Sequence, residues 1–248
     1  MDLGLLEAPD RDQWQKPDQI MDVLNIADGS VVAEIGAAGG WFTIRLARRV
    51  GPNGLVYAED IQATMVDAIE RRAQSENLRN VRTVLGGETD PNLPGGIDAV
   101  LIADTYREIE DPVTLLRNAA KSLRPQGRIG VVDYNAGGGG PGPAADQRVD
   151  PESVIKAAAA AGLQLLVREA LPPFQYVLVF GLPTARHSSG MAPDATASFT
   201  RSARMNGVKP DAIAPEKPSD GRATSASQPT PPAKITASPA SIARNDVP

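Results

Sequence analysis

The chain has no cysteine and only one histidine, His187, among its 248 residues. Without thiols it can form no disulfide and no thiolate metal site, and it has no cysteine nucleophile. A lone histidine cannot build a histidine metal site. We therefore expect no metal. A magnesium or calcium site made only of carboxylates is not excluded by this composition, but no segment has the ligand spacing of a calcium-binding loop.

Long apolar runs are also missing. No segment approaches the roughly 20 apolar residues that a membrane-spanning helix needs. The N-terminal stretch MDLGLLEAPDRDQWQKP has neither the basic start nor the sustained apolar region of a signal peptide. We expect a cytoplasmic protein without a membrane contact.

The last part of the chain, from Thr184 to Pro248, has few aromatic residues and no apolar period. It consists mainly of Ala, Ser, Thr and Pro, a composition that cannot bury enough surface to offset the entropy of ordering. The sequence predicts a folded domain over residues 1–183 and a disordered tail over residues 184–248.

Basic charge is scarce in the predicted folded part. The tail carries eight basic and five acidic residues, a net charge of +3, which leaves −8 for residues 1–183 because the whole chain is −5. A general nucleic-acid surface needs many cations to neutralise phosphates. We expect no nucleic-acid partner.

Strand and helix patterns alternate along the predicted domain, which indicates a largely parallel sheet with helices on both faces. Apolar runs predict strands at 30–35, 54–59, 81–85, 97–103, 127–133, 163–169 and 174–180. Helical spacing predicts helices at 17–26, 42–50, 62–77, 112–123 and 151–161. Only four residues separate the last two strands, so these strands should form an antiparallel hairpin at the sheet edge.

The first strand ends in a turn of small residues, Gly36-Ala37-Ala38-Gly39-Gly40. In open α/β sheets the ligand crevice lies beyond the carboxyl ends of the strands, and small residues allow a ligand to approach the backbone. A nicotinamide dinucleotide site is one alternative for such a turn. Its Gly-x-Gly-x-x-Gly pattern would require glycine at the positions of Ala38 and Trp41, so the spacing argues against it.

The stretch VVAEIGAAGGWFTIRLA resembles motif I of the class I S-adenosylmethionine-dependent methyltransferases, an acidic residue followed by Gly-x-Gly-x-Gly. Ala38 stands where that family has its central glycine. The resemblance implies a Rossmann-like, doubly wound seven-stranded sheet and S-adenosylmethionine as the cofactor. It also implies that Glu34, Gly36, Ala38 and Gly40 frame the amino-acid part of this cofactor.

The second predicted strand ends in Glu59-Asp60-Ile61, about twenty positions past the first turn. The family aligns its ribose-binding acidic residue with Asp60, which we prefer over Glu59, and Ile61 follows it at the cofactor. After the third strand the family commonly has Gly-Asp at the adenine. Here Gly86-Gly87-Glu88 replaces it, so Glu88 or main-chain groups must serve.

The segment IDAVLIADTYREIEDP resembles the family's motif at the reaction site, and LRPQGRIGVVDY resembles the segment before its fifth strand. The resemblance spans roughly residues 14–180 and includes WQKP at Trp14. Asp104, Tyr106 and Glu108 are the candidates for a catalytic base, if the acceptor must lose a proton. Asp104 has two further interpretations: it contacts the cofactor, or it only caps the segment after its strand.

These features predict a methyltransferase that moves a methyl group from S-adenosylmethionine to a small molecule by in-line displacement. A protein side-chain methyltransferase and a module that binds the cofactor without catalysis are the alternatives. A nicotinamide oxidoreductase ranks third. The glycine-rich segment at 134–150 is interpreted either as a flexible lid over the site or as a lax linker.

Overall fold

The computed structural model describes residues 8–137, 139–171 and 174–183, and the predicted tail at 184–248 lies outside the described residues. The helices and 3-10 turns are α2 (Arg11–Gln15), α3 (Pro17–Val23), α4 (Trp41–Val50), α5 (Ala63–Ser75), η1 (Tyr106–Glu108), α6 (Pro112–Lys121), η2 (Ala145–Gln147) and α7 (Pro151–Ala160). The strands are β1 (Val31–Ile35), β2 (Leu55–Asp60), β3 (Val81–Leu85), β4 (Ile97–Ala103), β5 (Leu123–Tyr134), β6 (Gln164–Leu171) and β7 (Gln175–Gly181).

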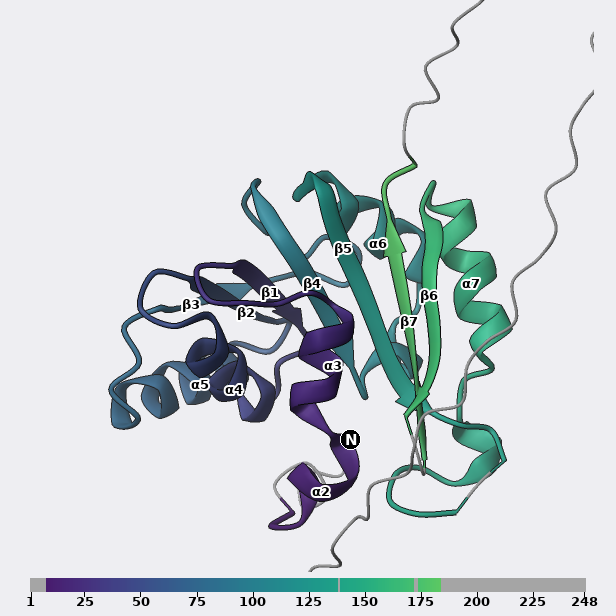
Figure 1. Ribbon diagram of the computed structural model, residues 1–248, viewed down its shortest axis with the longest axis horizontal. Coiled ribbons are helices and arrows are strands. Elements are labelled where there is room, and N and C mark those ends of the chain that lie inside the picture. The colour runs from purple at the N-terminus through teal and green to yellow at the C-terminus, as the bar shows by residue number, and fades with distance from the viewer. Residues whose placement is uncertain (1–7, 138, 172–173, 184–248) are drawn as a thin grey trace, which may run out of the picture. The chain divides into compact units, whose positions relative to one another are not determined.

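The strands form one seven-stranded sheet in the order β3-β2-β1-β4-β5-β7-β6 (Figure 1). The pairs from β3 to β5 are parallel, and β7 runs antiparallel to both of its neighbours. The predicted doubly wound sheet with an antiparallel C-terminal strand is confirmed. The strand order reverses between β1 and β4, which puts the expected ligand crevice at the carboxyl ends of these two strands.

Each face of the sheet has its own apolar core, because successive side chains of a strand point to opposite faces. On one face, Ile20 of α3, Phe42 of α4 and Ile69 of α5 pack with sheet residues. On the other face, Leu116 of α6 and Val154 of α7 do the same. The result is a three-layer arrangement in which helices cover both faces.

The helices of the second face, α6 and α7, begin with the same local signal. Asp111 precedes Pro112 in α6 and accepts a hydrogen bond from the backbone nitrogen of Thr114. Asp150 precedes Pro151 in α7 and accepts one from Glu152. An Asp N-cap followed by Pro satisfies a free donor and presets the first turn, so these starts follow from local sequence.

Two elements differ most from the prediction, while the predicted helices at 17–26 and 112–123 end two or three residues earlier, at Val23 and Lys121. Strand β5 begins at Leu123 rather than at residue 127, because Leu123 pairs with Ile97 before a register shift brings Arg128 opposite Ala99. Helix α2 was not predicted, since its sequence RDQWQ has no apolar period of its own. It is held in place by contacts with distant segments, described below.

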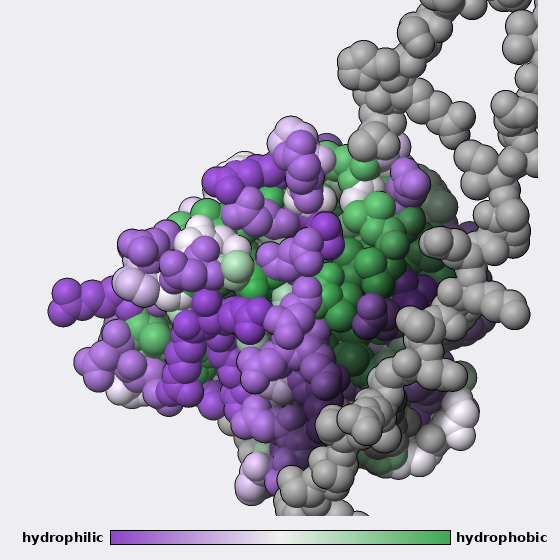
Figure 2. Space-filling model, viewed as in Figure 1, coloured by the Kyte–Doolittle hydropathy of each residue, from purple (hydrophilic) through white to green (hydrophobic). Residues whose placement is uncertain are grey.

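Polar residues dominate the surface over α3 and α4, whereas apolar residues gather toward β7 and β6 (Figure 2). Leu165 and Leu166 of β6 are among the large apolar side chains that remain exposed. Among the described residues, no helix is both long and apolar enough to cross a membrane.

Candidate active site

The turn after β1 has the backbone shape that its glycines allow. Gly36 has φ +72°, and a Cβ at this position would lie 2.7 Å from side-chain atoms of Thr105. Gly40 caps α4 with φ 78°. Ala38 also has a positive φ, 47°, which is costly for a residue with a side chain. Contacts with β2 hold the turn in this form.

Asp60, the last residue of β2, makes the first of these contacts. One of its carboxylate oxygens accepts a hydrogen bond from the backbone nitrogen of Ala38 at 2.9 Å. The other oxygen accepts one from the nitrogen of Gln62 at 2.9 Å. Two main-chain donors therefore orient a carboxylate that is 5% exposed, which is how a fixed acceptor of ligand hydroxyls is built.

Glu59 holds the turn from another side. It accepts a hydrogen bond from the nitrogen of Gly36 at 3.2 Å, and a Cβ on Gly86 would collide with its carboxylate. Burial raises the pKa of Glu59 to about 8. The hydrogen bond from Gly36 lowers this pKa, and the charge of Asp60 raises it. The two neighbouring acidic residues thus hold the turn at different points, Asp60 at Ala38 and Glu59 at Gly36.

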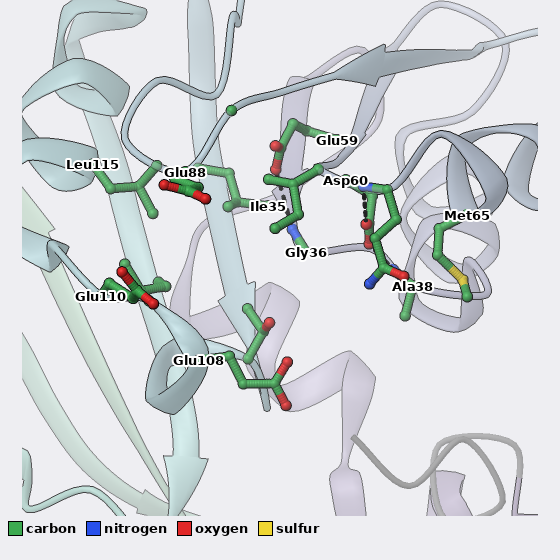
Figure 3. A pocket seen from close by; sticks show the side chains of 15 residues that line it. Ile35, Gly36, Ala38, Glu59, Asp60, Met65, Glu88, Glu108, Glu110 and Leu115 are labelled. Atoms are coloured by element: carbon green, nitrogen blue, oxygen red, sulfur yellow. Dashed lines mark hydrogen bonds between the residues drawn. The ribbon is translucent and has the colours of Figure 1, made fainter.

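A cavity of about 380 Å³ opens beside this turn, within the usual size range of small-molecule sites (Figure 3). Its lining comprises Ile35, Gly36, Ala38, Glu59, Asp60, Ile61, Gln62, Met65, Gly87, Glu88, Thr105, Glu108, Ile109, Glu110 and Leu115. Glu88, Glu108 and Glu110 lie across the cavity from the glycine turn (Figure 3). Among the residues that the structure describes, the lining combines acidic residues with apolar ones and carries no basic residue, which favours a cationic ligand with an apolar part.

Six of the predicted site residues line this cavity: Gly36, Ala38, Asp60, Ile61, Glu88 and Glu108. The predicted residues Glu34, Gly40, Asp104 and Tyr106 are not part of its lining. Of the three candidates for a base, the structure therefore puts only Glu108 at the cavity.

Glu34 lies behind the glycine turn, where it accepts a hydrogen bond from the hydroxyl of Thr43 in α4 at 2.5 Å. It is 4% exposed. Burial raises its pKa to about 7, against the Thr43 hydrogen bond and the charge of Arg11. Glu34 therefore joins β1 to α4 and adds a titratable carboxyl behind the turn.

Asp104 follows β4 and is covered by the N-terminal segment. Its Oδ2 accepts a hydrogen bond from Arg11 at 2.9 Å, and both groups are almost fully buried. Its Oδ1 accepts from the amides of Gln175 at 2.8 Å and of Gln15 at 3.4 Å. Burial raises the pKa of Asp104, and the charge of Arg11 opposes this rise.

Arg11 also stacks over Trp41, with 4.0 Å between the guanidinium carbon and the ring centre. Arg45 lies 3.5 Å from the centre of the same ring and binds both oxygens of Asp12, at 2.6 and 2.7 Å. Ion pairs and cation–π contacts thus attach α2 to the first turn of α4. Sequence analysis missed Arg11, Gln15 and Gln175. The only signal was the WQKP resemblance close to Arg11.

Tyr106 and Glu108 belong to η1, directly after Asp104. Tyr106 is 5% exposed, and its hydroxyl has no hydrogen-bond partner within the part of the chain that the structure describes. Glu108 lines the cavity and pairs with Arg107 at 3.3 Å. Among the described residues, no group of three or more acidic or histidine side chains could hold a metal ion.

Residues 32–127 match the family model described as a methyltransferase domain. Over this range the chain is a methyltransferase domain. The matched range begins in β1 and includes the glycine turn, Asp60 and the segment after β4. The predicted family and its cofactor, S-adenosylmethionine, are thereby confirmed.

Curated relatives and solved structures agree with this. The chain is 32% identical over 115 residues to the nocamycin O-methyltransferase of Saccharothrix syringae, which covers 46% of this chain and 41% of that protein. It is 24% identical over 132 residues to the demethylmenaquinone methyltransferase of Lactobacillus johnsonii, covering 52% and 53%. The chain spans about half the length of these relatives.

A solved S-adenosylmethionine-dependent methyltransferase of Aquifex aeolicus has the same fold, with a TM-score of 0.68 at 21% identity. This match covers 72% of the present chain and 95% of the other. The shared fold therefore spans almost the whole length of the Aquifex aeolicus protein.

Proposed function

We propose that this chain transfers the methyl group of S-adenosylmethionine to a small-molecule acceptor by in-line displacement. The observation that carries the proposal is the acidic cavity at the carboxyl ends of β1, β2 and β4, with Asp60 oriented by two main-chain donors. The two curated relatives are named for small-molecule substrates, nocamycin and demethylmenaquinone. The acidic domain is also a poor surface for nucleic acid.

The residues of the cavity match the parts of this cofactor. The glycine turn leaves no room for a Cβ at Gly36, so the backbone itself forms the floor on which the cofactor would lie. Asp60 would accept hydrogen bonds from the ribose hydroxyls, and Ile61 and Glu88 would enclose the adenine. The acidic lining favours the positive sulfonium.

The sulfonium supplies an already activated methyl group, so the protein needs no covalent nucleophile. The task of the chain is to hold the two reactants in line and to exclude water, which in favourable models contributes roughly 7–11 kcal/mol.

Calorimetric titration with S-adenosylmethionine and S-adenosylhomocysteine tests the proposal, with NAD as the negative ligand. Asp60→Ala should weaken binding at least about tenfold, since a charge-assisted hydrogen bond contributes about 1.5–3 kcal/mol. Asp67→Ala is the matched control, because Asp67 is an exposed carboxylate of α5 outside the cavity. Thermal unfolding of each variant shows whether it is folded.

Product formation on a panel of small phenols, enols and amines then tests transfer. Binding of NAD in place of S-adenosylmethionine would refute the cofactor assignment. Tight cofactor binding without turnover on any acceptor would favour a module that binds without catalysis, whereas turnover on proteins but not on small molecules would favour a side-chain methyltransferase.

A further inference from the structure

Three buried side-chain oxygens have no hydrogen-bond partner within the described residues: Tyr106 Oη, Asp133 Oδ2 and Tyr134 Oη. Their residues are 5%, 0% and 1% exposed. Buried polar atoms are rarely left without a partner, because burial without a hydrogen bond is costly. All three lie at the carboxyl ends of the adjacent strands β4 and β5. Tyr106 and Asp133 lie on the face of the sheet that α6 and α7 cover, whereas Tyr134 points to the opposite face, where its ring meets Trp14. The unpartnered oxygens of Tyr106 and Asp133 indicate a site whose partner is a ligand.

Asp133 is the charged member of this group. Its Oδ1 accepts a hydrogen bond from the backbone nitrogen of Tyr134 at 2.8 Å, which orients the carboxylate and leaves Oδ2 without a partner. Tyr176 is its register partner on β7. Tyr106 and Tyr176 belong to the same apolar core, so Asp133 and Tyr106 lie on the same face of the sheet.

This group adjoins the wall of the cavity. The backbone nitrogen of Asp104 donates to the carbonyl of Val132 at 2.9 Å, which joins the end of β4 to the residue before Asp133. The next residue, Thr105, lines the cavity, and Tyr106 follows it. The segment after β4 thus lines the cavity at Thr105 and carries one of the unpartnered oxygens on the next residue, Tyr106.

We propose that Asp133 is the base that accepts a proton from the methyl acceptor, that Tyr106 orients the same acceptor group, and that this group is a hydroxyl of a phenol or enol. The inference rests on the proposed function. The acceptor oxygen forms a bond to the methyl carbon with a lone pair, and the carbon–sulfur bond breaks with its electron pair left on sulfur. The hydroxyl proton passes to Asp133 Oδ2 and later to water.

The charges around Asp133 suit this role. Burial raises the pKa of Asp133 to about 6, and the charge of Asp104 also raises it. The hydrogen bond from Tyr134 and the charges of Arg107 and Arg148 lower this pKa. Asp133 is thus ionised at neutral pH and more basic than an exposed carboxylate. The nearby phenols stay neutral, because burial raises the pKa values of Tyr106, Tyr134 and Tyr176.

The glycine-rich segment that follows β5 contacts Tyr134, since a Cβ on Gly142 would lie 2.5 Å from the Tyr134 ring. Arg148 holds this segment by donating to the carbonyls of Asn135, Gly139, Pro141 and Pro143. Its guanidinium carbon lies 5.5 Å from the centre of the Tyr134 ring.

The test compares the wild type with Asp133→Asn and Tyr106→Phe. Tyr176→Phe is the matched control, because the Tyr176 hydroxyl is already paired with the carbonyl of Val149 at 3.3 Å. Asp133→Asn keeps the size of the side chain and an oxygen for the Tyr134 nitrogen. S-adenosylhomocysteine binding, measured for every variant, shows that the cofactor cavity is intact.

The first measurement is the absorbance of bound 4-nitrophenol as a function of pH, with and without S-adenosylhomocysteine. An ionised carboxylate beside the phenol disfavours the phenolate, so Asp133→Asn should lower the apparent pKa of the bound probe by about one unit or more. The second is methyl transfer to the phenol panel. Loss of a general base should lower kcat by about 100-fold or more and remove the acidic limb of the rate profile.

Equal probe titration and equal rates in Asp133→Asn would overturn the proposal and leave the proposed function intact. So would a wild type that binds S-adenosylhomocysteine but neither binds 4-nitrophenol nor methylates any hydroxyl compound. A chain that does not bind S-adenosylhomocysteine would contradict the proposed function. In that case the titration of 4-nitrophenol in the absence of S-adenosylhomocysteine would still show whether Asp133 lies beside the bound phenol.

Discussion

The ion pair between Arg11 and Asp104 should be the main attachment of the N-terminal segment to the site. Replacing Arg11 with Met keeps much of the side-chain volume and removes the charge. It leaves the Asp104 carboxylate 2% exposed, with Oδ2 deprived of the donor at 2.9 Å. The amides of Gln15 and Gln175 still donate to Oδ1.

Removing one partner of a buried ion pair typically costs about 3–5 kcal/mol, because the other charge stays buried. The two remaining amides put the expected loss at the lower end, about 3 kcal/mol. The double variant Arg11→Met, Asp104→Asn should recover part of this loss, since no buried charge remains. The loss should be smaller at pH 5 than at pH 8, because without Arg11 the buried carboxyl takes up a proton more readily.

Urea unfolding followed by circular dichroism measures these differences. With a urea slope of about 2 kcal/mol/M, Arg11→Met should lower the midpoint by roughly 1.5 M. Arg45→Met is the control: it also removes a cation from Trp41, but its partner Asp12 is 57% exposed in the side chain. It should cost about 1 kcal/mol or less. Equal losses in both variants, or no recovery in the double variant, would refute this account of α2.

Two further predictions concern Glu59 and Arg148. Because burial raises the folded pKa of Glu59 from 4.5 to about 8, the free energy of unfolding should fall as pH rises from 4.5 to 8. Glu59→Gln should flatten this slope in urea unfolding curves and gain a few kcal/mol at most over the wild type at pH 9; parallel curves would contradict it. Arg148→Ala should raise amide hydrogen exchange about tenfold or more over residues 139–148, since four carbonyls lose their donor. Arg168→Ala removes only an exposed ion pair with Glu152 and should leave this exchange unchanged. Equal amide protection of residues 139–148 in the two variants would show that the segment folds without Arg148.

Most of the fold was predictable because its signals are local. Apolar runs and helical spacing located the seven strands and the main helices. The short link between the last two strands predicted their antiparallel pairing. The 12-residue length of β5 was not predictable, since it depends on a register shift against β4. Helix α2 was missed because its attachments are side chains from distant parts of the chain.

The sequence by itself determined the glycine turn, the acidic residue at the end of β2 and the family, because turn chemistry and the succession of strands and helices along the chain depend on residues close together in the sequence. Only the tertiary structure decided which carboxylates meet the cavity. Asp104 and Glu108 are four positions apart, yet Asp104 is covered by Arg11, 93 residues away, and by Gln175, 71 residues away. Asp133 showed no signal in the sequence, since an unpartnered oxygen exists only once every neighbour has been placed.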